Sequence, residues 1–257
     1  MKAAKILREK IASGAVTTGV LATDHAWPGL VEILRRADID YLIVDQEHGA
    51  HNDAQVAEIC ALGRLIDFPV LLRAVDTQYA TVRRAIDRGP CGLMLPSVSA
   101  PEELDRVRDS IYMPPRGKRR PGGPGTWWIQ DFQYKTWKSE VEAHFIVLPQ
   151  IETKTGLANV NAIAAHEITT AIAIGPYDLS AELGVCWRPE SPILQEAIDK
   201  IRRAGQKAGK PMWHIGNGPD LVRQGFTFIC IGEPIGVLMQ ALTDINRDTK
   251  TATNERK

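Results

Sequence analysis

Polar and charged side chains gather at the ends of the β-type runs of this sequence. The candidates for chemistry are Asp45, Gln46, Glu47, His48, Arg73, Asp76, Gln150, Glu152 and Asp178. Residues two apart in a strand share a face, so Asp45 should lie beside Glu47, and Gln150 beside Glu152. If the strands are parallel, their carboxyl ends meet at one edge, and these side chains could form an acid–base, carboxylate-binding or metal site there.

Glu152 and Asp178 follow consecutive β-type runs and offer two hard carboxylate oxygens. Such ligands suit a divalent cation that keeps several waters, namely Mg²⁺ or Mn²⁺, with Co²⁺ as a further candidate. Zinc would favour more His or Cys ligands. The alternative interpretation is a pair of solvated or ion-paired carboxylates, and residue types alone leave both open.

His48 and Arg73 are the candidates for proton transfer and for anion binding. Histidine changes charge close to neutral pH, and a carboxylate such as Asp45 could orient the His48 ring as a general base. Arg73 ends an apolar run, and its planar guanidinium matches a carboxylate through two parallel hydrogen bonds. A hydrogen-bonded structural histidine and an internal arginine ion pair are the competing interpretations.

The positions of the lysines argue against one class of carbon–carbon chemistry. A Schiff-base aldolase on a barrel needs a lysine at a strand end, yet residues 156–199 contain none. Lys154 lies just past Glu152, and Lys210 lies at the amino end of its β-type run, the wrong end for such a lysine. If the protein works on carbon–carbon bonds, a metal ion is the expected electron sink.

The elements that would position these residues alternate regularly. β-type runs occupy residues 17–22, 39–45, 68–74, 91–96, 144–152, 169–175, 210–216 and 226–232, with amphipathic helical segments between them. This alternation predicts an α/β fold, a parallel (β/α)8 TIM barrel, with a doubly wound open sheet as the alternative. We expect one domain over residues 1–247, a long loop of the βα type over 112–128, and a frayed polar tail over 248–257.

The amino-acid composition limits which classes of binding partner can be expected. The 257 residues are 44% hydrophobic, enough for a sizeable core, and 31 Lys and Arg balance 31 Asp and Glu. A balanced charge gives no general attraction for nucleic acid or an anionic membrane, so neither is expected as a partner. Four scattered cysteines and the lack of an apolar leader or spanning run predict a cytoplasmic protein.

Several motifs occur together in order: LIVDQEHGAHN, VLLRAVD, AIDRGPCGLMLPSV, MPPRGKRR, LPQIET and IGPYDLSAELG. As a set they resemble the HpcH/HpaI aldolase family of metal-dependent class II pyruvate aldolases, over nearly the whole chain. The resemblance implies a barrel of the phosphoenolpyruvate/pyruvate type. It also implies that His48 is the base, that Asp45 belongs to the same site, and that Arg73 binds the carboxylate and keto oxygen of a pyruvate unit.

The resemblance extends to the metal and to a second subunit. It implies that Glu152 and Asp178 are the metal ligands and that Gln150 belongs to the substrate or metal shell. The backbone of Gly175 and Pro176 would line the pyruvate pocket. Two further residues come from the same matching: Asp87, which would reach a neighbouring subunit's site in a hexamer and help organise the base, and Arg119, expected to bind substrate.

The activity expected from these features is cleavage and formation of 4-hydroxy-2-oxo acids, giving pyruvate and an aldehyde. The small-molecule partners are therefore a 2-oxo acid and an aldehyde. Two alternatives are kept: an oxaloacetate-type decarboxylase that forms the same enolate, and a non-catalytic barrel that binds pyruvate-like acids. The identity of the aldehyde and of the metal does not follow from the sequence.

Overall fold

Eight parallel strands form a closed barrel in sequence order in the computed structural model, which describes residues 1–252. The strands are β1 (Thr17–Ala22), β2 (Tyr41–Asp45), β3 (Val70–Arg73), β4 (Gly92–Leu95), β5 (Ile146–Ile151), β6 (Ile172–Ile174), β7 (Met212–Ile215) and β8 (Phe228–Cys230). The first strand pairs with the last, with Thr17 opposite Phe228, so the sheet has no open edge. The expected (β/α)8 barrel is confirmed, and the open-sheet alternative is not adopted.

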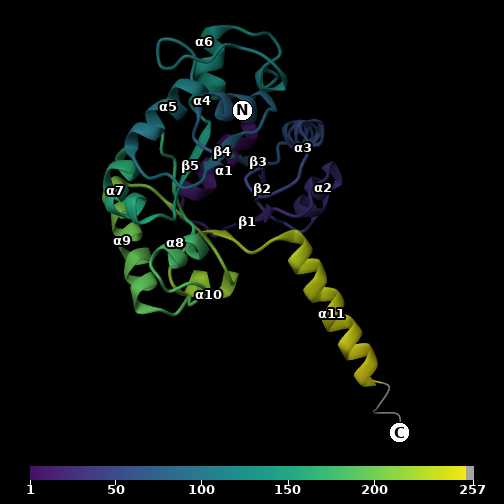
Figure 1. Ribbon diagram of the computed structural model, residues 1–257. Coiled ribbons are helices and arrows are strands. Elements are labelled where there is room, and N and C mark those ends of the chain that lie inside the picture. The colour runs from purple at the N-terminus through teal and green to yellow at the C-terminus, as the bar shows by residue number, and fades with distance from the viewer. Residues whose placement is uncertain (253–257) are drawn as a thin grey trace.

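Helices connect the strands and cover the outside of the barrel (Figure 1). Residues spaced three and four apart, as in the buried Leu194, Ile198 and Ile201 of α9, give such a helix the apolar stripe that packs on the sheet. The α-helices are α1 (Lys2–Ala12), α2 (Pro28–Arg36), α3 (Asp53–Leu65), α4 (Tyr79–Asp87), α5 (Pro101–Ile111), α6 (Tyr134–Trp137), α7 (Lys154–Ala165), α8 (Pro176–Glu182), α9 (Pro192–Ala208), α10 (Gly218–Arg223) and α11 (Pro234–Ala252).

Two large aromatic residues fill the barrel interior below the ends of the strands. Trp213 Nε1 donates to the Tyr41 hydroxyl (2.8 Å), and that hydroxyl donates to the Ile229 carbonyl (2.7 Å). Gly19 opposite Tyr41 is required, because a Cβ there would lie 2.2 Å from the Tyr41 ring. With its polar atoms paired, this layer forms a rigid floor under the carboxyl ends of the strands.

The Pro- and Gly-rich segment after Tyr112 is not the βα loop that its composition suggested. It follows α5 and precedes β5, so the chain has already crossed back to the amino ends of the strands. A 3-10 turn (Pro124–Thr126), the short α6 and a π-helical turn (Lys138–Glu142) interrupt it. The cationic residues of this segment therefore lie at the opposite end of the barrel from the carboxyl ends of the strands.

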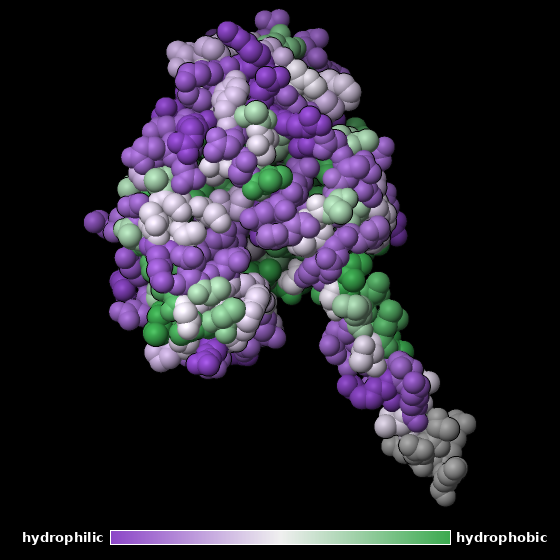
Figure 2. Space-filling model, in the orientation of Figure 1, coloured by the Kyte–Doolittle hydropathy of each residue, from purple (hydrophilic) through white to green (hydrophobic). Residues whose placement is uncertain are grey.

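Helix α11 departs from the barrel (Figure 1). None of its residues, all within the described part of the chain, is buried, and Val237, Leu238, Met239, Leu242 and Ile245 are 53–64% exposed. Figure 2 shows apolar residues along the proximal part of this helix. The helix continues to Ala252, past the point where the polar tail was expected to begin, and residues 253–257 lie outside the described residues.

No helix within residues 1–252 combines the length and the apolar character needed to cross a membrane.

Candidate active site

A cavity of about 620 Å³ opens at the carboxyl ends of the strands. Its lining comes from several strand ends and the loops after them, and includes His48, Arg73, Gln150, Asp178 and Trp213. This is the end of a (β/α)8 barrel at which catalytic groups are found. The alternating pattern of the sequence thus brings most of the expected site residues to one opening.

Arg73, at the end of β3, is fixed by Asp45 at the end of the neighbouring β2. Arg73 Nε donates to Asp45 Oδ1 (2.8 Å) and Arg73 Nη2 donates to Asp45 Oδ2, and both side chains are buried. Burial acts to raise the pKa of Asp45, but the hydrogen bonds and charge of Arg73 outweigh it and lower that pKa. The internal ion pair and a role at the cavity are therefore compatible, because Arg73 also lines the opening.

The sequence suggested that Asp45 orients the His48 ring, but the structure shows no contact between the two side chains. Its Oδ1 accepts the backbone N–H groups of Glu47 (2.9 Å) and His48 (3.4 Å), and its Oδ2 accepts the Thr23 hydroxyl (2.9 Å). With Arg73 as well, its acceptor positions are taken. Asp45 therefore holds Arg73 and the turn after β2 in place, and orients no imidazole.

Glu47 is the carboxylate beside the His48 ring. His48 Nε2 lies 3.6 Å from Glu47 Oε2, and the His48 side chain is 59% exposed. The same Glu47 oxygen lies 3.3 Å from Arg73 Nε. Burial raises the pKa of Glu47, and the neighbouring cations only partly offset this effect. Glu47 thus links the histidine to the fixed arginine.

Glu152, directly after β5, is almost completely buried, at 3% exposure. Its Oε1 accepts the Ser97 N–H (2.6 Å) and the Ser97 hydroxyl (2.9 Å), and its Oε2 accepts Gln150 Nε2 (2.5 Å). The expected proximity of Gln150 to Glu152 is thus present. Gln150 Oε1 is buried without a hydrogen-bond partner among the described residues, so the site retains an acceptor that a ligand or water can satisfy.

Three carboxylates concentrate negative charge at this position. Burial raises the pKa of Glu152 to about 7, and the charges of Glu47 and Asp178 add to the effect against the opposing Ser97 hydrogen bonds. A divalent cation would relieve this repulsion, and carboxylate and amide oxygens suit Mg²⁺ or Mn²⁺. Among residues 1–252 no group of three or more His, Cys, Asp or Glu is placed so that it could hold a metal ion.

Gly175 allows the close packing around Glu152. A Cβ at this position would lie 2.1 Å from Glu152 Oε2 and 2.7 Å from Gln150 Nε2. Gly175 precedes Pro176, which begins α8 and restricts its start to a helical φ angle. Both residues line the cavity, and Asp178 is exposed on the first turn of this helix.

Asp87 and Arg119 are not part of this opening within one chain. Asp87 ends α4, at the amino side of β4, where its Oδ1 accepts Arg119 Nη2 (3.1 Å). Arg119 is 1% exposed, and its guanidinium lies over the Trp137 ring. The substrate-binding role expected for Arg119 thus finds no support inside a single chain. Arg119 follows α5, where the chain has returned to the amino ends of the strands, so it lies at the other end of the barrel.

Sequence reasoning missed two neutral residues that hold the acids. Ser97 donates twice to Glu152, and its φ of 52° is a left-handed conformation that residues other than glycine rarely adopt. Thr23, just after β1, donates to Asp45. Both follow strand ends, and that position was the available signal, but neither carries a charge that would have marked it.

The fold and the site together define a (β/α)8-barrel enzyme with an acidic, arginine-bearing opening. The family model for the HpcH/HpaI aldolase/citrate lyase family matches residues 22–239. A hydroxypyruvate/pyruvate aldolase of Pseudomonas aeruginosa is 29% identical over 247 residues, 93% of this chain and 90% of that protein. A 5-keto-4-deoxy-D-glucarate aldolase of Escherichia coli is 30% identical over 226 residues, 83% of this chain and 85% of that protein.

Among solved structures, an HpcH/HpaI aldolase from Desulfitobacterium hafniense superposes with a TM-score of 0.88 at 24% identity, covering 95% of this chain and 96% of that chain. The chain belongs to the HpcH/HpaI aldolase/citrate lyase family, as its motifs indicated. It is accordingly a carbon–carbon lyase of the aldolase type.

Proposed function

We propose that this protein is a class II pyruvate aldolase that cleaves and forms 4-hydroxy-2-oxo acids, with one divalent cation, Mg²⁺ or Mn²⁺, as its cofactor. The observation that carries the proposal is the pairing at one opening of a fixed cation, Arg73, with the crowded carboxylates Glu47, Glu152 and Asp178. A 2-oxo acid needs both features. Its carboxylate requires a positive partner such as Arg73, and its keto oxygen requires an electrophile, which would be the cation held by the carboxylates. The named relatives are aldolases, which agrees with this reaction.

Glu152 and Asp178 would hold the cation, with Gln150 in its surroundings. A bound divalent cation supplies positive charge that stabilises the enolate of pyruvate. Gln150 is suited to this place because its Oε1 has no hydrogen-bond partner among the described residues. The backbone at Gly175 and Pro176 leaves space for a small acid against these side chains.

Arg73 would bind the substrate carboxylate and stabilise charge that develops on the adjacent oxygen. Its Nε and Nη2 are directed at Asp45, so the guanidinium cannot rotate freely when a substrate approaches. This preorganisation reduces the entropy lost on binding. Asp45 is in this scheme a positioning residue for Arg73.

His48 would accept the proton of the C4 hydroxyl, directly or through a water. As the C4–O bond becomes a carbonyl, the C3–C4 bond breaks, its electron pair enters the enolate of pyruvate, and the aldehyde leaves. A proton returned to C3 then gives pyruvate. Glu47, 3.6 Å from the ring, stabilises the protonated imidazole that forms during the step.

The direct test measures pyruvate release from a panel of 4-hydroxy-2-oxo acids by chelator-treated protein, with and without added Mn²⁺. We expect cleavage only with the metal, and a rate lowered about 10²- to 10⁴-fold in His48→Ala. His144→Ala, a histidine at the amino side of β5, is the matched control and should leave the rate unchanged. Full turnover in a strong chelator would contradict the proposal.

The same variant separates the aldolase from an oxaloacetate decarboxylase. Decarboxylation forms the same enolate but has no hydroxyl proton to remove, so His48→Ala should spare it while strongly slowing aldol cleavage. Equal loss of both activities would contradict the role given to His48. Saturable binding of pyruvate without turnover of any 2-oxo acid would favour a non-catalytic binding protein.

We also propose that copies of this chain assemble, with a hexamer expected from the family resemblance. The support is α11, whose apolar residues are exposed and which extends away from its own barrel (Figure 1, Figure 2). Asp87, paired with Arg119 outside the opening of its own chain, would act at the site of a second copy. A monomer in light scattering would remove this role of Asp87.

A further inference from the structure

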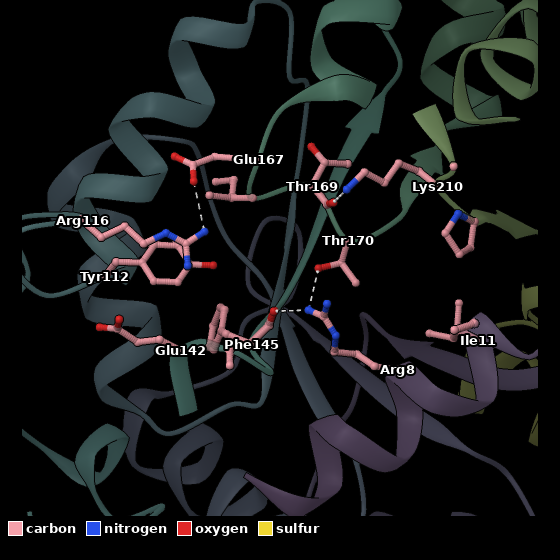
Figure 3. A pocket seen from close by; sticks show the side chains of 15 residues that line it. Arg8, Ile11, Tyr112, Arg116, Glu142, Phe145, Glu167, Thr169, Thr170 and Lys210 are labelled. Atoms are coloured by element: carbon pink, nitrogen blue, oxygen red, sulfur yellow. Dashed lines mark hydrogen bonds and ion pairs between the residues drawn. The ribbon is translucent and has the colours of Figure 1, made fainter. Parts of the chain in front are cut away.

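A second cavity, of about 400 Å³, lies at the opposite end of the barrel from the proposed active site. Phe145 directly precedes β5, Thr170 comes shortly before β6, and Lys210 and Pro211 directly precede β7, so the amino ends of three strands form one wall. Arg8 of α1 closes the other side (Figure 3). Its volume is within the range of small-molecule sites.

Two cations in this cavity have no carboxylate partner. Arg8 Nη1 donates to the Phe145 carbonyl (3.1 Å) and to Thr170 Oγ1 (3.4 Å), and Lys210 Nζ donates to the Thr169 carbonyl (2.6 Å). Among the described residues, no Asp or Glu lies within ion-pair distance of Arg8 or Lys210. Both positive charges are therefore held by neutral oxygens only.

Neither of the two carboxylates on the cavity wall pairs with Arg8 or Lys210. Glu167 lies 3.3 Å from Arg116 Nη2 and 3.3 Å from Arg108 Nη1. Glu142 Oε1 accepts the Met113 N–H (2.8 Å), whereas Glu142 Oε2 is buried without a hydrogen-bond partner among the described residues. Figure 3 shows this carboxylate directed away from Arg8 and Lys210. The half of the cavity next to α1 therefore keeps its positive charge.

Hydrogen-bond donors with unused capacity also line this half of the cavity. Thr170 Oγ1 accepts from Arg8 and from the Val147 N–H (3.1 Å), which leaves the Thr170 hydroxyl hydrogen free to donate. The Tyr112 side chain is 3% exposed and lines the same space, and within residues 1–252 its hydroxyl has no hydrogen-bond partner. Arg8 and Lys210 each have further N–H groups beyond those in use. A wall of unpaired donors is complementary to an oxyanion.

Burial of the two cations also favours the binding of an anion. It lowers the pKa of Arg8 and the pKa of Lys210, and the charge of Arg8 lowers that of Lys210 further. Two like charges that face one cavity and have no paired carboxylate are stabilised by an anion that enters between them.

We propose that this cavity is a binding site for a small dianionic oxyanion, held by Arg8, Lys210, Thr170 and Tyr112. Two unpaired cations match two negative charges, and guanidinium and ammonium groups are the usual partners of phosphate and carboxylate oxygens. The site is separate from the proposed active site and does not depend on the proposed reaction. Because Arg8 belongs to α1 and the other groups to the barrel, the ligand would join the amino-terminal helix to the strand ends.

The test uses chelator-treated full-length protein at low ionic strength, titrated with inorganic phosphate or with succinate, and with chloride at matched ionic strength as the blank. We expect saturable binding in calorimetry, by phosphate if the natural ligand carries a phosphoryl group and by succinate if it is a dicarboxylic acid. Arg8→Gln and Lys210→Gln should each weaken binding at least tenfold. Lys207→Gln, an exposed lysine of α9 outside the cavity, should bind as the unaltered protein does.

Hydrogen exchange locates the site and separates it from Arg73. The ligand should slow amide exchange in α1 and around Thr170 and Lys210, and should leave the segments around Asp45 and Glu152 unaffected. This measurement needs no variant, so it is decisive even if Arg8→Gln folds poorly. Binding of neither anion above the chloride blank, equal binding by the two variants and the control, or protection confined to the Asp45 and Glu152 segments would overturn the proposal.

Discussion

Replacing Glu152 by Gln should separate the stability of the barrel from its activity. Burial raises the pKa of the Glu152 carboxyl from 4.5 to about 7. One unit of pKa corresponds to about 1.4 kcal/mol, so the ionised carboxylate destabilises the metal-free folded state by about 3 kcal/mol relative to the protonated form. Glu152→Gln carries no charge to ionise and should lack this penalty.

The sign of the pH dependence follows from the raised pKa. Below pH 4.5 the carboxyl is protonated in the folded and unfolded chain alike, so charge contributes no difference there. Between pH 4.5 and about 7 the unfolded chain loses this proton first, and the folded protein loses stability as pH rises. Above that window the penalty is complete and constant. The stability of Glu152→Gln relative to the unaltered protein should therefore rise by up to about 3 kcal/mol across this window.

The surroundings can accommodate the amide. Its oxygen can accept the two Ser97 donors, and its NH₂ group can face Gln150 if the Gln150 amide turns and presents Oε1, which has no partner among the described residues. Urea unfolding in chelator from pH 4.5 to 8 measures the stability, and Mn²⁺-dependent pyruvate release measures the activity. We expect loss of activity and of stabilisation by Mn²⁺. A stability difference that does not change with pH, or a variant that stays fully active with Mn²⁺, would refute the reasoning.

Three further perturbations test the positioning of the site and the assembly. Gly175→Ala should lower kcat/KM about 100-fold while circular dichroism shows an intact fold. The added Cβ would lie 2.1 Å from Glu152 Oε2, so the Glu152 carboxylate would have to move. Normal kinetics would contradict this packing. Asp45→Asn should cost about 3–5 kcal/mol in urea unfolding and raise KM for the 2-oxo acid. Asp220→Asn, in an exposed pair with Arg223, should cost far less, and similar losses in the two variants would be the contrary result. The double variant Leu238→Glu, Leu242→Glu on α11 should dissociate the assembly, which light scattering would show as a lower molar mass. The control Gln240→Glu should leave the molar mass of the assembly unchanged. An unchanged molar mass in the double variant would exclude α11 from the contact.

The barrel could be predicted because its signal is repeated. Most of the β-type runs are buried on both faces and most connecting helices carry an apolar stripe, so the repeated pattern supports one architecture. The connection after Tyr112 was assigned to the wrong end of the barrel, because its Pro and Gly residues indicate a loop without indicating which end it occupies. The departure of α11 gave no signal either, since an amphipathic helix has the same sequence pattern whether it packs on its own barrel or elsewhere.

The site was predicted where adjacency in a strand determines it, and not where partners are chosen in space. Gln150 and Glu152 are two residues apart in extended chain, and they meet as expected. The partner of Asp45 was misjudged because both His48 and Arg73 were compatible with it in sequence. The register Asp45↔Arg73 between β2 and β3 decides the matter, and a single sequence does not contain that register.

The opening joins two charged groups whose surroundings act in opposite directions. Arg73 is stabilised in its charged form, because Asp45 outweighs the burial that would lower its pKa, and so the Arg73 pKa is raised. Glu152 is destabilised in its charged form, because burial and neighbouring acids exceed what the Ser97 donors provide. A permanent positive charge suits an anionic substrate that must be bound and released without proton transfer. A carboxylate whose negative charge is not balanced by a nearby positive group, as in Glu152, suits a cation, because binding of the cation removes the repulsion. The two groups together match a 2-oxo acid that binds with a metal.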